Sequence, residues 1–178
     1  MSSRLITTWS DYDGAVQEIL DRSTATLQIF DEDLAPLRLE SPERIAVLRG
    51  LLVARESHQR LTIVVQKPDF VRQYSPQLMH LLTVYAPSLT VIHSPPHLDK
   101  FKDSLLIADG RHTLIRFHRD HARARLILDD VHECTPHTKR FEEIVAAARR
   151  ATQSDHAWTV RSTPPISRGM GRGRGRRS

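Results

Sequence analysis

Three short apolar runs, separated by segments of helical character, constrain the fold of this chain most strongly. The runs are TLQIF at 26–30, LTIVVQ at 61–66 and LTVIH at 89–93. LTIVVQ is continuous and rich in β-branched residues, as expected of a strand covered on both faces of a parallel sheet. A Ser-Pro-Glu helix start at 41–43 and an apolar helical pattern over 75–84 separate the runs. The β-α-β-α-β order predicts an α/β fold with parallel crossover connections.

The second half of the chain adds strands of a different kind. SLLIA at 104–108 leads through Asp109-Gly110 into TLIRFH at 113–118, which predicts a hairpin. A third strand is expected within ARARLILDD, and a closing helix over 137–150. The sequence therefore predicts a mixed β-sheet with flanking helices.

Four segments describe the expected domain organisation. Residues 1–24 form an N-terminal helical extension with its helix at 11–22, and residues 25–150 form the α/β domain. Residues 151–166 are expected to be a linker and 167–178 a disordered Arg-Gly tail. No stretch approaches the ~20 apolar residues of a membrane span, and the start lacks a secretory signal, so we expect a soluble, cytoplasmic protein.

The positive charge of the chain is concentrated in the tail. The whole sequence has 26 Lys and Arg against 21 Asp and Glu, and SRGMGRGRGRRS at 167–178 holds five arginines and no acid. Residues 1–166 therefore have 21 basic and 21 acidic residues and no net charge. Arginine forks bind phosphates and stack on bases, so RNA or DNA is the partner expected for the tail. The residues concerned are Arg168, Arg172, Arg174, Arg176 and Arg177.

The element order, together with FKDSLLIADGRHTLI at 101–115, resembles one half of a phospholipase D superfamily protein. The resemblance covers about residues 25–150 and implies a phospholipase D-like half-domain. The segment is similar to the family's H-x-K-x4-D signature, whose Asp and following Gly fall on Asp109 and Gly110. The family's Lys position falls on Ser104 and its His position on Lys102.

These replacements bear on the reaction that the resemblance implies. The family uses its His as a nucleophile on phosphorus and its Lys to stabilise charge on the phosphoryl oxygens. Lys102 does not readily replace the His, and Ser104 supplies no positive charge. The resemblance therefore implies a degenerate motif at Lys102, Ser104 and Asp109 without catalytic residues.

Other chemistry finds little support in the sequence. The glycines outside the tail are too few for a Gly-rich phosphate loop, and the ten histidines match no zinc spacing. The acidic loop at 31–33 offers carboxylates for Mg²⁺, but a solvated loop is the simpler interpretation. We therefore expect no cofactor and no metal. Residues that could contact a ligand or phosphate are His97, Lys102, Arg116, Arg123 and Arg125. The three arginines could alternatively protect an exposed strand edge by their charge.

The sequence favours a non-catalytic phospholipase D-like domain that acts as a binding or interaction module, with weak, nonspecific nucleic-acid binding through the tail. One alternative is a phosphodiesterase or nuclease with an altered active site that uses Asp109, Lys102 and neighbouring histidines, completed across a homodimer. A second alternative is a structural domain that binds a protein partner.

Overall fold

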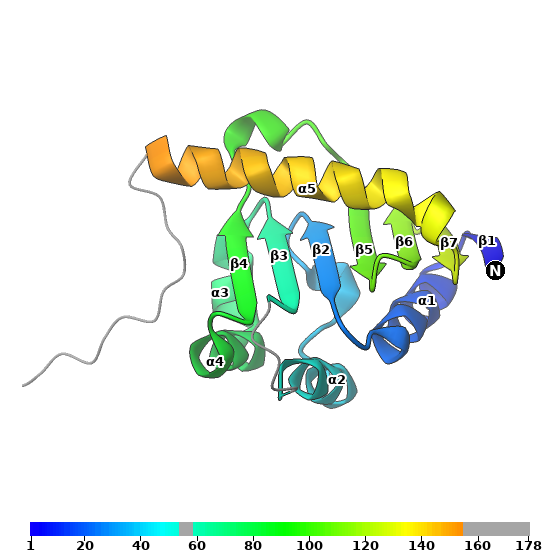
Figure 1. The fold of residues 1–178 in the computed structure, drawn as a ribbon, viewed down its shortest axis with the longest axis horizontal. Helices are drawn as coiled ribbons and strands as arrows, with labels where there is room; N and C mark the ends of the chain where they lie inside the picture. Colours follow the sequence, from blue (N-terminus) through cyan, green and yellow to red (C-terminus); the bar gives the residue numbers. More distant parts are fainter. Residues whose placement is uncertain (54–58, 155–178) are drawn as a thin grey trace, which may run out of the picture.

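A seven-stranded mixed sheet forms the centre of the molecule in the computed structural model, which describes residues 1–53 and 59–154 (Figure 1). The strand order is β1-β7-β6-β5-β2-β3-β4. The strands are β1 (Ser2–Ile6), β2 (Leu27–Asp31), β3 (Leu61–Val65), β4 (Leu89–His93), β5 (Ser104–Ala108), β6 (His112–Arg116) and β7 (Ala124–Leu128). The three strands β2, β3 and β4 are parallel, and every other pairing is antiparallel. The expected mixed sheet with flanking helices is confirmed.

The helices divide between the two faces of the sheet. The described helices are α1 (Trp9–Arg22), α2 (Pro42–Val53), α3 (Pro68–Tyr74), α4 (Pro76–Tyr85) and α5 (Val131–Ser154), with 3-10 turns η1 (Ala35–Leu37) and η2 (Pro96–Leu98). Helices α1 to α4 cover one face, and α5 crosses the other from β7 towards β4 (Figure 1). Each face thus has its own apolar core.

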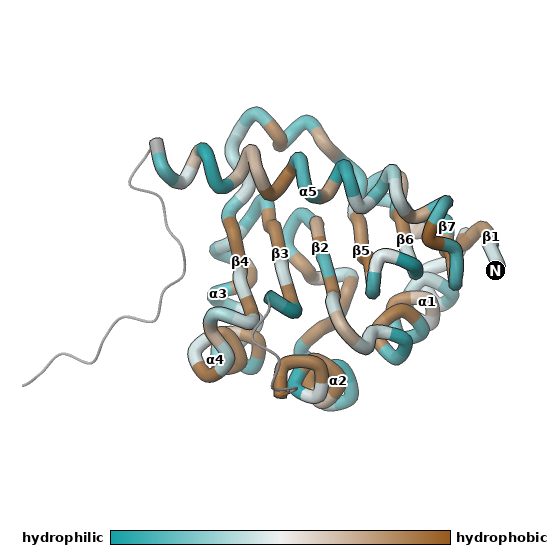
Figure 2. The backbone as a smooth tube through the Cα atoms, in the orientation of Figure 1, coloured by the Kyte–Doolittle hydropathy of each residue, from teal (hydrophilic) through white to brown (hydrophobic). Residues whose placement is uncertain are grey.

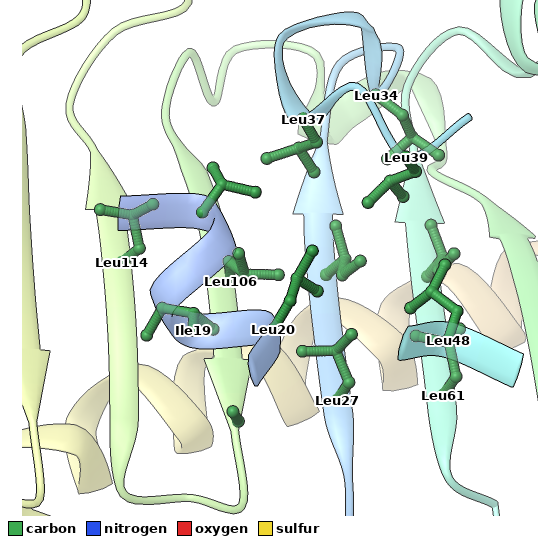
Figure 3. Packing of buried hydrophobic residues seen from close by; sticks show 14 of the residues in the cluster. Ile19, Leu20, Leu27, Leu34, Leu37, Leu39, Leu48, Leu61, Leu106 and Leu114 are labelled. Atoms are coloured by element: carbon green, nitrogen blue, oxygen red, sulfur yellow. The ribbon is translucent and has the colours of Figure 1, made fainter. Parts of the chain in front are cut away.

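The core under α1 and α2 is built from leucine and isoleucine side chains. Ile19 and Leu20 of α1 lie over Leu27 and Leu106, and Leu48 of α2 lies over Leu61 (Figure 3). On the opposite face, a second cluster joins Phe141 and Ile144 of α5 to the strands. Its strand residues are Phe30, Val64, Ile92, Leu105, Ile107, Ile115 and Ile127. Much of β3 and β5 is brown in the hydropathy colouring, because both faces of these strands are buried (Figure 2).

Capping side chains explain where several helices differ from the sequence-based expectation. Thr8 accepts a hydrogen bond from the backbone of Asp11, so α1 begins at Trp9. The carboxylate of Asp130 accepts from the backbone N–H of Glu133, so α5 starts at Val131, well before the expected 137. It also continues to Ser154, into the range expected as a linker.

Two further elements differ from the expectation. The segment expected as one helix over 75–84 belongs to α4, and α3 precedes it; Glu40 accepts hydrogen bonds from the backbone N–H groups of Gln77 and Leu78 at the start of α4. Strand β1 was not expected, because its only buried residue is Ile6 and its sequence lacks an apolar pattern. It pairs with β7, so the strand carrying Arg125 is not the sheet edge.

Candidate functional site at the ends of strands β2, β5 and β6

Three polar side chains lie in one row across neighbouring strands. The register pairs Phe30 with Leu105, which places Asp31 at the end of β2 beside Ser104 at the start of β5. Ser104 in turn pairs with Arg116 of β6. Because side chains alternate along strands, all three point to the face covered by α1. The row lies at the edge where β2, β3 and β4 end, which is where open α/β sheets commonly bind ligands.

An enclosed ion pair occupies this row. Nη2 of Arg116 lies 3.1 Å from Oδ1 of Asp31, and the two side chains are 1% and 0% exposed. Nη1 of Arg116 donates to the backbone carbonyls of His118 and Arg119. The second carboxylate oxygen of Asp31 accepts the backbone N–H of Leu34 at 2.8 Å. The network compensates both charges inside the protein, as a buried pair requires.

Two aromatic rings of α1 cover the guanidinium of Arg116. Its Cζ lies 5.6 Å from the ring centre of Trp9 and 5.4 Å from that of Tyr12, within cation–π range. The rings meet edge to face with centres 5.7 Å apart. Burial, followed by the nearby charge of Asp31, raises the pKa of the Tyr12 hydroxyl, so it stays protonated. These side chains therefore cover the position next to Ser104.

A second ion-pair network lies beside the first. Arg119 forms a salt bridge with Glu32, and its Nη2 donates to Oε1 of Gln66 at 3.0 Å. The amide of Gln66 donates to the carbonyls of Leu98 and Phe101. Burial alone would raise the pKa of Glu32, but Lys67 and Arg119 outweigh it and lower that pKa.

The acidic loop at 31–33 is therefore engaged with basic side chains and backbone N–H groups. Within residues 1–53 and 59–154, no group of three or more His, Cys, Asp or Glu side chains is arranged to hold a metal ion. The sequence-based interpretation of this loop as merely solvated differs from the structure, since Asp31 is fully buried.

The residues expected at the degenerate motif do not converge. Lys102 is exposed in the connection between β4 and β5, where its Nζ donates to the carbonyl of Asp99 at 2.9 Å. His97 is exposed in η2 of the same connection. Ser104 is buried at the start of β5, whereas Asp109 follows its far end, about 17 Å further along the strand.

Asp109 holds the segment that leads into β2. Its carboxylate accepts hydrogen bonds of 2.8–2.9 Å from the backbone of Thr24, Ala25 and Thr26 and from the hydroxyl of Thr24. Burial would raise the pKa of this carboxyl, but these hydrogen bonds outweigh it and hold the pKa below the ordinary 3.8. Asp109 and Gly110 both have positive φ, as the hairpin turn requires.

The arginines expected to form a phosphate-contacting stripe are separated. Arg116 is enclosed, and Arg123 is exposed just before β7. Arg125 donates to the hydroxyl of Ser3 at 2.9 Å and pairs with Glu133 of α5 at 2.8 Å. The alternative of a charge-protected edge fails for Arg116, because β6 lies between β5 and β7, and for Arg125, because β1 covers β7. The tail residues Arg168, Arg172, Arg174, Arg176 and Arg177 lie outside the described residues.

Sequence reasoning missed the partners of Arg116. Asp31 belongs to an acidic loop that looks solvated in the sequence, and nothing local links it to an arginine 85 residues further on. The apolar residues near Trp9 and Tyr12 indicate a helix that faces the core. They do not indicate that the two rings cover the guanidinium of Arg116. Only the register of β2, β5 and β6 brings these residues together.

The fold resembles those of two solved structures, one of which is a phospholipase D family member. The structure of TrmBL2, an archaeal chromatin protein whose structure shows a novel mode of DNA binding, is similar over 83% of this chain and 54% of that chain, with 14% identity and a TM-score of 0.60. Nuc, a phospholipase D family member from Salmonella typhimurium, is similar over 83% of this chain and 96% of its own, with 13% identity and a TM-score of 0.52. This chain thus spans about half the length of TrmBL2 and nearly all of Nuc.

The other comparisons find no relatives. No family model and no curated protein matches the sequence. In the part of the chain that the structure describes, no helix is long and apolar enough to cross a membrane.

Proposed function

We propose that this chain is a non-catalytic phospholipase D-like domain that acts as a binding module, with nonspecific nucleic-acid affinity supplied by its Arg-Gly tail. The observation that carries the first part is the enclosed Arg116–Asp31 pair beside Ser104. At the position where the resemblance implies a Lys, the neutral hydroxyl of Ser104 stands next to a cation whose charge is already compensated. Among the described residues of this row, no free positive charge is left to stabilise a phosphoryl oxygen.

The charge distribution supports the second part. Residues 1–166 have equal numbers of acidic and basic side chains, and residues 167–178 add five arginines. Within the described residues, the buried arginines at the site are engaged by carboxylates and carbonyls. The tail therefore dominates electrostatic attraction to a polyanion. TrmBL2, a DNA-binding chromatin protein, shares the fold and adds support for a nucleic-acid partner.

Deletion of residues 167–178 tests the tail. Binding of a fluorescein-labelled single-stranded oligonucleotide is measured by anisotropy at several salt concentrations. We expect markedly weaker binding at low salt, and a salt slope smaller by roughly 0.7 for each phosphate that the tail neutralises. A variant with all five arginines changed to lysine keeps the charge and serves as the matched control. Unchanged binding after deletion would reject the role of the tail.

A phosphodiesterase assay tests the non-catalytic assignment. The alternative, a phosphodiesterase or nuclease with an altered active site, is favoured by the fold shared with Nuc, a phospholipase D family member. Purified full-length protein is incubated with bis(p-nitrophenyl) phosphate and with single-stranded DNA, with and without divalent cations. We expect no turnover. Turnover that disappears in His97→Ala, while the chain stays folded, would overturn the proposal.

A further inference from the structure

A pocket lined by polar, cationic and aromatic side chains lies next to the enclosed ion pairs. It has a volume of about 520 Å³, within the usual range for small-molecule sites. Its lining comes from the residues that follow β3, from α3 and from the last residue of β4. These residues are Gln66, Lys67, Pro68, Asp69, Phe70, Arg72 and His93. The parallel pairing of Val65 with His93 brings the two strand ends together.

An aromatic pair lies at this pocket. Phe70 lines it, and the ring of Tyr74 packs against Phe70 with ring centres 4.6 Å apart. Tyr74 is 55% exposed although it sits on a helix whose Val71 is buried in the core. An exposed ring supported by a second ring is the kind of surface on which an unpaired base stacks.

Cationic side chains stand beside the aromatic pair. Lys67 is 63% exposed and forms a salt bridge with Glu32, and Arg72 pairs with Asp69, whose side chain is 92% exposed. An ammonium has three N–H donors and a guanidinium five, so both side chains can add a phosphate while they keep their carboxylate partners. His93 adds an imidazole at the same wall. The pocket therefore offers cationic donors and a stacking surface within one site.

We propose that this pocket binds one nucleotide of a single-stranded nucleic acid, with its base against Phe70 and Tyr74 and its phosphate at Lys67 and Arg72. The inference rests on the proposed nucleic-acid function and assigns part of it to the folded domain. A duplex keeps its bases stacked and paired, so it cannot offer one to the aromatic pair. Because the tail belongs to the same chain, a strand held by the tail meets the pocket at a high effective concentration.

The experiment uses the full chain and a fluorescein-labelled dT12 oligonucleotide at low salt. Tyr74→Ala should weaken dT12 binding by about tenfold, since removing the stacking surface for one base costs that order of affinity. Tyr74→Phe should bind like the parent, because the ring and not the hydroxyl carries the contact. Arg72→Gln should weaken binding several-fold. A 12-base-pair duplex should bind Tyr74→Ala and the parent equally.

Matched controls come from the distant part of the fold. Val131→Ala removes another largely exposed apolar side chain at the opposite edge of the sheet, and Arg111→Gln removes an arginine that pairs with Asp129 as Arg72 pairs with Asp69. Both should leave dT12 binding unchanged. Circular dichroism and thermal melting verify that every variant is folded.

The outcomes separate the two proposals. If the parent binds dT12 and Tyr74→Ala and Arg72→Gln behave like the controls, the pocket is rejected while the tail function stands. If the tail-deleted chain keeps residual dT12 binding that Tyr74→Ala removes, the pocket is supported independently of the tail. If the full chain binds no dT12 at low salt, both proposals fail.

Discussion

The guanidinium of Arg116 and the carboxylate of Asp31 lie 3.1 Å apart and are shielded from solvent, although β6 and β2 are not adjacent in the sheet. Ser104 of β5 stands between them in the register. Because the residue at position 104 is neutral, the guanidinium of Arg116 on β6 can reach the carboxylate of Asp31 on β2.

Removing one member of the pair should destabilise the fold strongly. Arg116→Met leaves the Asp31 carboxylate buried and unpaired, and we expect a decrease of about 3–5 kcal/mol in the free energy of unfolding. Urea denaturation at pH 7 measures this decrease. The double variant Arg116→Met/Asp31→Asn should be destabilised by less than the sum of the single changes. Additive effects would show that the two groups do not interact.

Restoring the residues of the resembled family should not restore activity. In Lys102→His/Ser104→Lys, the new ammonium would be buried between Arg116 and Asp31. The site would then hold two cations against one carboxylate that Arg116 already engages, and the like charges would repel. We expect no hydrolysis of bis(p-nitrophenyl) phosphate and a decrease in stability of about 1–3 kcal/mol. Lys102→His alone, at an exposed position, is the control and should be as stable as the parent. Clear turnover by the double variant would contradict the view that the site is closed.

Asp109→Asn should reduce stability without touching the site at the other end of β5. The amide offers one acceptor oxygen to donors that now share two carboxylate oxygens, so we expect a decrease of about 1–3 kcal/mol in the free energy of unfolding. Because the folded pKa of Asp109 lies below 3.8, its contribution is present above pH 3.8 and disappears as the pH falls through the folded pKa. The free energies of unfolding of the parent and the variant, measured as the pH is lowered, should converge in that range.

His112 should make the fold sensitive to mild acid. Its side chain is buried, and its Nδ1 accepts the backbone N–H of Asp129 at 3.1 Å. Burial, together with Arg22 and Arg111, lowers the pKa of His112 below the ordinary 6.5 despite the nearby carboxylate of Asp129. As the pH falls, the imidazole of His112 is therefore protonated first in the unfolded chain. The contribution of His112 to the free energy of unfolding is thus present above pH 6.5 and declines below it.

The variant His112→Asn isolates this effect. Its side-chain oxygen can accept the same hydrogen bond but does not titrate. The difference in unfolding free energy between parent and variant, followed by urea denaturation from pH 8 to pH 5, should change only below about pH 6.5. A difference that stays constant over this range would exclude His112 as the titrating group.

The fold could be predicted from the sequence further than the site could. Continuous apolar runs mark β3 and β5 because both of their faces are buried, and Asp109-Gly110 marks the hairpin because its φ angles are positive. Strand β1 carries no such pattern, since its partner β7 and not its own composition holds it. The enclosed pair joins residues 85 positions apart, and no local pattern encodes that distance.

The exposure of the aromatic rings on α3 could not be predicted from the sequence either. Tyr74 and Phe70 are spaced i, i+4, which in a sequence is typical of a core-facing helical stripe. Whether such a ring faces the core or solvent depends on how α3 is rotated over the sheet. Val71 takes the buried position, and this leaves Tyr74 outside.

The position of α5 has a consequence for synthesis on the ribosome. Within the described residues, it is the only helix packed on its face of the sheet, and it follows all seven strands in the chain. Until α5 has been made, Phe30, Val64 and Ile92 lack the cover of Phe141 and Ile144, and a nascent chain that ends near Asp130 exposes much of this apolar sheet face. Such surfaces recruit chaperones and aggregate. The domain can therefore complete its folding only after α5 has been synthesised.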